Sequence, residues 1–180
     1  MRTNVIITDD FYNNPHEVRN FALQQEFNVI GNFPGKRTKS FIWPSVKDTI
    51  QGILNLKVTN WMEHDYSGAF QAVVKNETTW IHTDHFNMWA GVCYLTPDAP
   101  HECGTGLYIH KPTKSMTRVA KGMVDDSLNE KEFELHDVIG NRFNRLVLYR
   151  SDIYHTSLGY FGDSMNNCRL FQVFFFDTEY

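Results

Sequence analysis

Cysteine is scarce in this chain of 180 residues, and its three copies form no CxxC pair. Neither a disulfide framework nor a thiolate zinc site is therefore expected. Long hydrophobic runs are also lacking: none approaches the roughly 20 residues of a membrane span, and the first residues lack the apolar stretch of a signal peptide. The net charge is only −4, which gives no electrostatic case for nucleic acid or anionic membrane as a partner. We expect a cytoplasmic protein in a reducing setting.

Aromatic and other apolar residues are plentiful, at 14% and 42% of the chain. Flat side chains pack well on pleated surfaces, so the composition favours a β-rich interior. The length suits one domain spanning residues 1–180 with a substantial core.

The first third of the chain, about residues 1–67, predicts a short strand and two helices. The strand is "NVIITDDF", and the helices lie in "NNPHEVRNFALQQEF" and "PSVKDTIQGILNL". Each helix is expected to open with a capping box. The capping pairs are Asn14 with Glu17, and Ser45 with Asp48. The basic cluster "GKRTK", residues 35–39, is interpreted as a solvated loop rather than a phosphate-binding patch.

From residue 68 to about 177 the chain changes to short β-type runs separated by turn residues. These runs are "AFQAVV", "MWAGVCYLT", "GLYIH", "RLVLYR" and "CRLFQVFFF". Helices followed by many strands predict an α+β domain, mainly β, whose larger part is a sandwich or barrel. Residues 114–141 are polar, with weak helical periodicity, and are interpreted as an insertion or lid.

Three separated elements carry residues with metal or anion chemistry. His82 and Asp84 are two positions apart and so share a face of extended chain, although one such triplet is expected by chance. His155 follows the run "LVLYR" and a short polar turn. Arg169 opens a strand so apolar that its guanidinium needs an acidic partner, either a ligand or a side chain such as Asp177.

In order and spacing, these residues resemble the Fe(II)- and 2-oxoglutarate-dependent oxygenases, in particular the prolyl 4-hydroxylase-like branch. The likeness extends to "GVCYLTPDAPHECGTGLYIHK" and to the Arg-led closing strand "RLFQVFFFD", and covers about residues 68–113 and 143–177. The resemblance implies a double-stranded β-helix, or jelly roll, with the N-terminal helices packed on one sheet. Two departures are the separated glycines Gly104 and Gly106 and the long spacing from His155 to Arg169.

The resemblance also implies roles for the site residues. His82, Asp84 and His155 would be the catalytic Fe(II) ligands, leaving three open positions on an octahedral ion. The cosubstrates 2-oxoglutarate and O₂ would fill these positions, and the products would be succinate, CO₂ and a substrate hydroxylated at an aliphatic C–H. Arg169 would bind the far carboxylate of 2-oxoglutarate, and Tyr94 would donate its hydroxyl to the same group. Halogenation is disfavoured because Asp84 is present.

Two other classes stay open: a non-catalytic jelly-roll binding module, and a cupin-type metalloenzyme that does not use 2-oxoglutarate. Neither needs a buried arginine at position 169. A dinuclear zinc hydrolase is disfavoured because Trp80 stands where that motif needs histidine. Whether Gln71 or His85 joins the site is open. The substrate, a small molecule or a peptide, is unidentified, and its selectivity is expected to lie in residues 31–40, 114–141 and 158–167.

Overall fold

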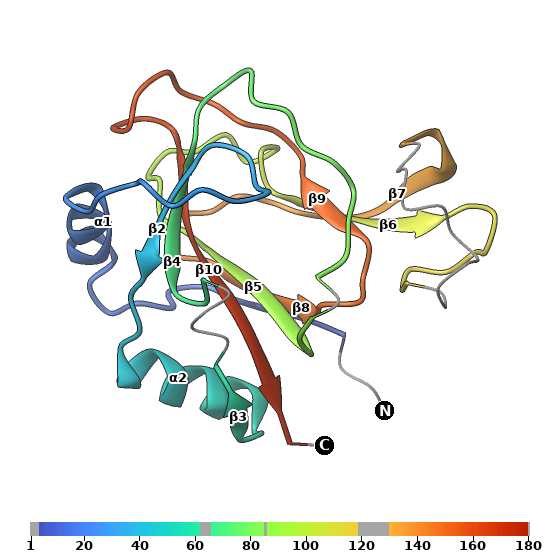
Figure 1. Ribbon diagram of the computed structural model, residues 1–180, viewed down its shortest axis with the longest axis horizontal. Helices are drawn as coiled ribbons and strands as arrows, with labels where there is room; N and C mark the ends of the chain where they lie inside the picture. The colour runs from blue at the N-terminus through green and yellow to red at the C-terminus, as the bar shows by residue number, and fades with distance from the viewer. Residues whose placement is uncertain (1–3, 62–65, 85, 119–129, 180) are drawn as a thin grey trace.

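The computed structural model describes residues 4–61, 66–84, 86–118 and 130–179 (Figure 1). Among these residues, neither α-helix has the length and apolar character needed to cross a bilayer. His85 and residues 119–129 of the expected insertion lie outside the described residues. The elements in chain order are β1 (Val5–Thr8), α1 (Pro15–Leu23), β2 (Lys36–Ser40), α2 (Pro44–Leu54), β3 (Val58–Asn60), β4 (Ala69–Val73), β5 (Trp89–Tyr94), β6 (Thr105–His110), the 3₁₀ turn η2 (Glu130–Glu132), β7 (Phe133–Ile139), β8 (Leu146–Arg150), β9 (His155–Ser157) and β10 (Arg169–Thr178).

Within the described residues, ten strands form two antiparallel sheets. The larger sheet has the order β1-β8-β5-β10-β4-β2, and β3 pairs with the end of β10. The smaller sheet has the order β7-β6-β9. The expected double-stranded β-helix, mainly β with two helices, is confirmed, because short antiparallel strands from distant parts of the chain form two sheets around a shared interior.

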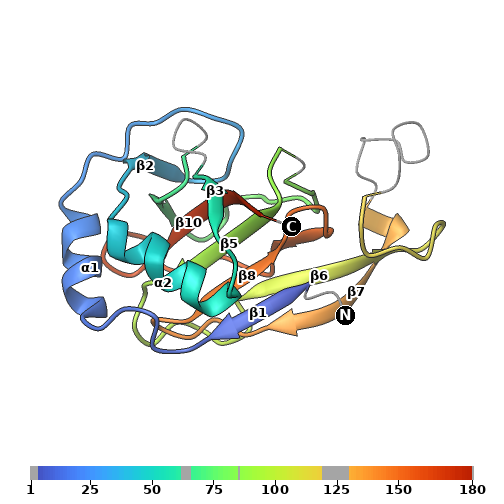
Figure 2. The ribbon, with the colours of Figure 1, turned by 90° about the horizontal axis from the view of Figure 1, so that it is seen from below.

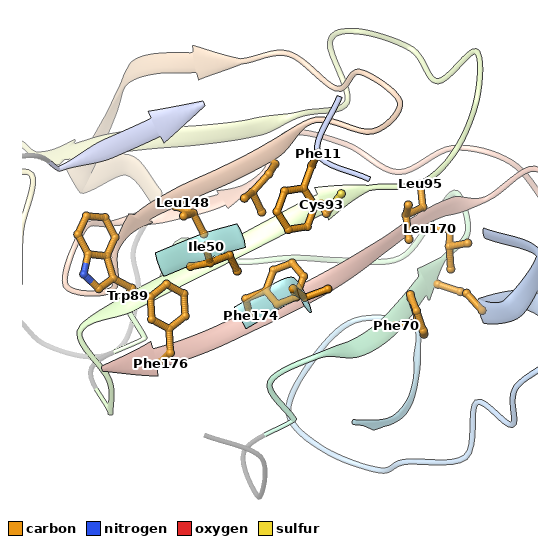
Figure 3. Packing of buried hydrophobic residues seen from close by; sticks show 14 of the residues in the cluster. Phe11, Ile50, Phe70, Trp89, Cys93, Leu95, Leu148, Leu170, Phe174 and Phe176 are labelled. Atoms are coloured by element: carbon orange, nitrogen blue, oxygen red, sulfur yellow. The ribbon is translucent and has the colours of Figure 1, made fainter. Parts of the chain in front are cut away.

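Side-chain alternation along β10 separates two apolar layers. Leu170, Phe174 and Phe176 belong to the larger core cluster, which also contains α2 residues, whereas Phe171 and Val173 belong to the cluster between the two sheets. Because successive strand side chains point to opposite faces, a strand that is apolar throughout is buried on both sides. β10 therefore lies between the helices and the interior of the jelly roll, and Figure 3 shows the cluster on the helix side.

The helices cover the outer face of the larger sheet (Figure 2). Ala22 of α1 and Val46 and Ile50 of α2 are buried against it, as their spacing predicts. The predicted capping boxes are wrong. Neither helix has a side-chain cap hydrogen bond; each begins at a proline, whose missing N–H and restricted φ suit the first helical position.

Two polar segments that were interpreted as irregular contain strands. The basic cluster at residues 35–39 is not a solvated loop: Lys36–Ser40 forms β2 at the edge of the larger sheet, and Arg37 and Thr38 are buried. Residues 133–139 of the expected insertion form β7, which pairs along its length with β6. Both are edge strands, where one side faces solvent and polar residues obscure the β pattern.

Truncation of Leu148 tests the position of the main core. This fully buried residue of β8 packs in the layer beneath the helices, whereas Leu135 of β7 is 45% exposed. We expect Leu148→Ala to lower the free energy of unfolding by about 2–5 kcal/mol through the cavity that it leaves. Leu135→Ala, the matched control, should cost less than about 1 kcal/mol. Urea unfolding followed by circular dichroism measures both, and equal losses would contradict the assigned core.

Candidate metal and 2-oxoglutarate site

The two candidate histidines are neighbours because their backbones pair. His82 N donates to His155 O at 3.0 Å, and His155 N donates to His82 O at 2.9 Å, which joins the segment between β4 and β5 to the start of β9 (Figure 1). The imidazole centroids are consequently 4.4 Å apart. Asp84 is fixed in turn by its backbone N–H, which donates to Ser151 O at 2.8 Å. Backbone hydrogen bonds therefore position all three side chains.

The ring nitrogens have a defined orientation. Nδ1 of His82 lies 3.0 Å from the carbonyl of Trp80, and Nδ1 of His155 lies 2.8 Å from the carbonyl of Ile153. Because a carbonyl can only accept, each Nδ1 carries a proton, and in the neutral imidazole this leaves the Nε2 lone pair available. This is the arrangement in which histidine binds a metal through Nε2.

Both Nε2 atoms face the same carboxylate. His82 Nε2 is 3.8 Å from Asp84 Oδ1, and His155 Nε2 is 3.3 Å from Asp84 Oδ2. One ligand atom from each residue lies within 4.8 Å of the other two. The predicted convergence of His82, Asp84 and His155 is present, and two imidazoles with one carboxylate are the donor set of non-haem Fe(II) sites.

The protonation states near neutral pH suit a divalent cation. Burial, together with the neighbouring His155, lowers the pKa of His82 to about 4, so its imidazole is neutral. Burial acts to raise the pKa of Asp84, but a hydrogen bond with His155 and the charges of His155, His82 and Arg37 bring the pKa below its ordinary value. A neutral imidazole and an ionised carboxylate are the forms that coordinate metal.

Arg169 lies at the head of β10 and is 1% exposed. Its Nη2 donates to Gly104 O at 3.1 Å, and its Nη1 donates to the hydroxyl of Ser157. Nε is buried with no hydrogen-bond partner in the described structure. Asp177, named as an alternative partner, lies near the other end of β10 and accepts from Met88 N at 2.8 Å, and among the described residues no ion pair joins it to Arg169. Arg169 thus faces the interior with a charge that its protein partners do not neutralise.

Tyr94 lies close to Arg169 but not on the cavity surface. Its hydroxyl is 2.6 Å from Thr105 Oγ1, and the Arg169 guanidinium carbon is 5.5 Å from its ring centroid. Burial raises the pKa of Tyr94, so the phenol keeps its proton. Thr105 does line the cavity. The hydroxyl contact expected between Tyr94 and 2-oxoglutarate stays a prediction, with Thr105 as a neighbouring donor.

One cavity of about 480 Å³ connects these groups. It lies between the sheets, and the three candidate ligands and Arg169 all line it. Its volume is in the range of small-molecule sites. Gln71, left open from the sequence, also lines it, and its Nε2 donates to Pro34 O at 2.7 Å.

Arg37 is the cavity residue that sequence reasoning missed. Its Nε and Nη2 both donate to Gln71 Oε1, and its guanidinium carbon lies 3.9 Å from the centroid of the Phe33 ring. Burial lowers the pKa of Arg37 to about 10, which leaves it charged at neutral pH. The sequence could have indicated Arg37 only through its position on the inward face of β2. Because residues 35–39 were interpreted as a loop, that position was not recognised.

Solved structures share the fold of this chain. HygX from Streptomyces hygroscopicus, solved with nickel, 2-oxoglutarate and hygromycin B, aligns with a TM-score of 0.66 and 12% identity over 96% of this chain and 82% of its own. The chain also shares its fold with solved prolyl hydroxylases. A Pseudomonas putida prolyl-4-hydroxylase aligns with a TM-score of 0.51 and 15% identity, over 96% of this chain and 91% of its own.

A Trichoplax adhaerens prolyl hydroxylase, solved with a peptide of hypoxia inducible factor, also has the prolyl hydroxylase-like fold. It aligns with a TM-score of 0.55 and 15% identity, over 97% of this chain and 84% of its own. No protein-family model matches the sequence, and no curated protein sequence matches it either. The resemblance seen in the motifs is thus confirmed for the fold.

Proposed function

We propose that this protein is an Fe(II)- and 2-oxoglutarate-dependent dioxygenase that hydroxylates an aliphatic C–H bond of an organic substrate, with release of succinate and CO₂. The observation that carries the proposal is the convergence of His82 Nε2, His155 Nε2 and the Asp84 carboxylate at one point, with each Nδ1 held by a backbone carbonyl. The prolyl hydroxylase-like fold supports it. The proposal includes a reducing compartment such as the cytoplasm, since all three cysteines are free.

The residues of this chain fit such an iron centre. His82, Asp84 and His155 would hold Fe(II) and leave adjacent positions open toward the cavity. Bound Fe(II), with 2-oxoglutarate and O₂, would supply the oxidising chemistry. The imidazole of His155 packs against Tyr149, with ring centroids 4.5 Å apart, and this contact fixes the ring plane and helps to exclude water from one side of the site.

Arg169 would bind the carboxylate of 2-oxoglutarate that lies far from the iron. Its unpartnered Nε and the cavity-facing side of its guanidinium provide charge-assisted donors. Ser157 and Gly104 hold the guanidinium in place, so little side-chain freedom is lost when the acid binds. A cosubstrate with a neutral group at this end would leave the buried cation without a counter-charge, so the site would favour a dicarboxylate.

A binding measurement tests the proposal without knowledge of the substrate. Anaerobic addition of Fe(II) and 2-oxoglutarate should give the weak visible metal-to-ligand charge-transfer band that reports chelation through the carboxylate and keto oxygens. Succinate, which lacks the keto group, is the matched control and should give no band. Absence of the band in protein that is folded by circular dichroism would favour a binding module or a cupin-type metalloenzyme instead.

A further inference from the structure

Arg37 gives the cavity a second cation, separate from the proposed 2-oxoglutarate anchor. In the larger sheet Arg37 of β2 pairs with Gln71 of β4, and Gln71 pairs with Phe171 of β10. Arg169 lies two residues before Phe171 and two strands away from Arg37, which places the two Cα atoms about 12 Å apart from ordinary strand spacings. The two side chains therefore start from separate points on the cavity wall.

The two guanidiniums also have different partners. Arg169 is held by Ser157 and Gly104, whereas Arg37 is held by Gln71 and by the face of Phe33. Gln71 is a neutral amide, so it fixes the position of Arg37 without neutralising its charge. The described structure contains no carboxylate within 4.0 Å of the Arg37 guanidinium; Asp84 acts on it only at longer range.

The charges that line the cavity indicate that a further bound anion is needed to balance them. The charged side chains among its described lining residues are Arg37, Arg169 and Asp84. A divalent iron and doubly charged 2-oxoglutarate would cancel each other, which leaves one positive charge. A buried cation without a counter-charge is costly, so a bound anion at Arg37 stabilises it.

We propose that Arg37 binds the carboxylate of a small organic acid, and that this acid is the primary substrate. The inference rests on the proposed dioxygenase function and names its substrate class. Phe33, Trp80 and Phe86 line the same cavity, so the acid would carry an apolar body beside its carboxylate. Planar carboxylates suit the two-pronged geometry of a guanidinium.

Calorimetric titration with a matched pair of probes tests this assignment. The probes are 3-phenylpropionate and its neutral amide, 3-phenylpropionamide, added anaerobically to protein that holds Fe(II) and saturating 2-oxoglutarate. We expect the acid to bind at least about tenfold more tightly than the amide, because the amide lacks charge-assisted bonds to Arg37. Equal affinities, no binding of the acid, or displacement of the acid by 2-oxoglutarate would overturn the proposal.

Variants locate the charge that the acid recognises. Arg37→Gln should lower the affinity for 3-phenylpropionate to that of the amide, and Arg37→Lys should keep part of the preference. Lys39→Gln is the matched control, because Lys39 is an exposed residue of the same strand and should leave the preference unchanged. A full preference in folded Arg37→Gln would overturn the assignment; if that variant fails to fold, Arg37→Lys and the wild-type comparison decide.

Two further measurements show whether a negative result contradicts the substrate class or the dioxygenase function. Phenyl phosphate binding more than tenfold tighter than 3-phenylpropionate would overturn the carboxylate assignment in favour of a phosphate-type anion. The same titration on protein without iron tests acid binding at Arg37 independently of the proposed dioxygenase function. An Arg37-dependent preference there, without the visible iron band, would contradict only the dioxygenase function. The band without the preference would contradict only the substrate class.

Discussion

Replacement of Asp84 by alanine is expected to abolish succinate formation while the fold is retained. Asp84 supplies the carboxylate that faces both Nε2 atoms, and this carboxylate is ionised at neutral pH. Loss of residues that merely orient metal ligands costs 10–100-fold, so loss of a ligand itself should lower turnover by more than about 100-fold. Succinate released with saturating Fe(II) and 2-oxoglutarate measures this effect.

The control for this variant is Asp48→Ala, which removes an exposed carboxylate from α2, far from the cavity lining. It should keep full turnover, since such surface substitutions change stability little. Circular dichroism should show the same secondary structure in both variants, because Asp84 lies outside the strands and its backbone bond to Ser151 survives truncation. Full turnover by Asp84→Ala would remove this residue from the metal site.

The parts of the fold that sequence predicts are those with strong apolar patterns. The runs that became β4, β5, β6, β8 and β10 are bounded by turn residues and are largely buried. Edge strands β2 and β7 were missed, because every residue of β2 is polar and five of the seven residues of β7 are exposed. Their strand conformation is imposed by pairing with β4 and β6, which is a tertiary effect that local propensity does not contain.

The candidate site was predictable where chemistry restricts residue type. The site was recognised from a combination of residues, although the triplet of His82 and Asp84 alone could occur by chance. The combination adds His155 and an arginine at the head of an apolar strand. Arg37 was not, since a lysine- and arginine-rich segment is ordinarily a solvated surface. Its burial depends on Phe33, which stacks on the guanidinium, and on Gln71, which accepts its hydrogen bonds. Neither contact is visible before the chain is folded.

Replacement of Arg169 by glutamine should raise the Michaelis constant for 2-oxoglutarate at least about tenfold, with a smaller effect on the rate at saturation. Hydrogen bonds to charged groups are worth about 1.5–3 kcal/mol, and one factor of ten corresponds to about 1.4 kcal/mol. Arg169→Lys keeps the positive charge but loses the two-pronged geometry of the guanidinium. Its Michaelis constant for 2-oxoglutarate should therefore lie between those of the wild type and Arg169→Gln. Succinate formation measured across 2-oxoglutarate concentrations gives both kinetic constants.

Arg169 also joins Ser157 and Gly104 to β10, so Arg169→Gln will lose some stability. Its control must therefore replace another buried arginine that makes a similar structural contact. Arg19→Gln does so: Arg19 is 8% exposed and donates to Leu95 O at 2.9 Å, outside the cavity. Its Michaelis constant for 2-oxoglutarate should match the wild type even if its melting temperature falls. An unchanged constant in Arg169→Gln, with a raised one in Arg37→Gln, would exchange the roles of the two cavity arginines.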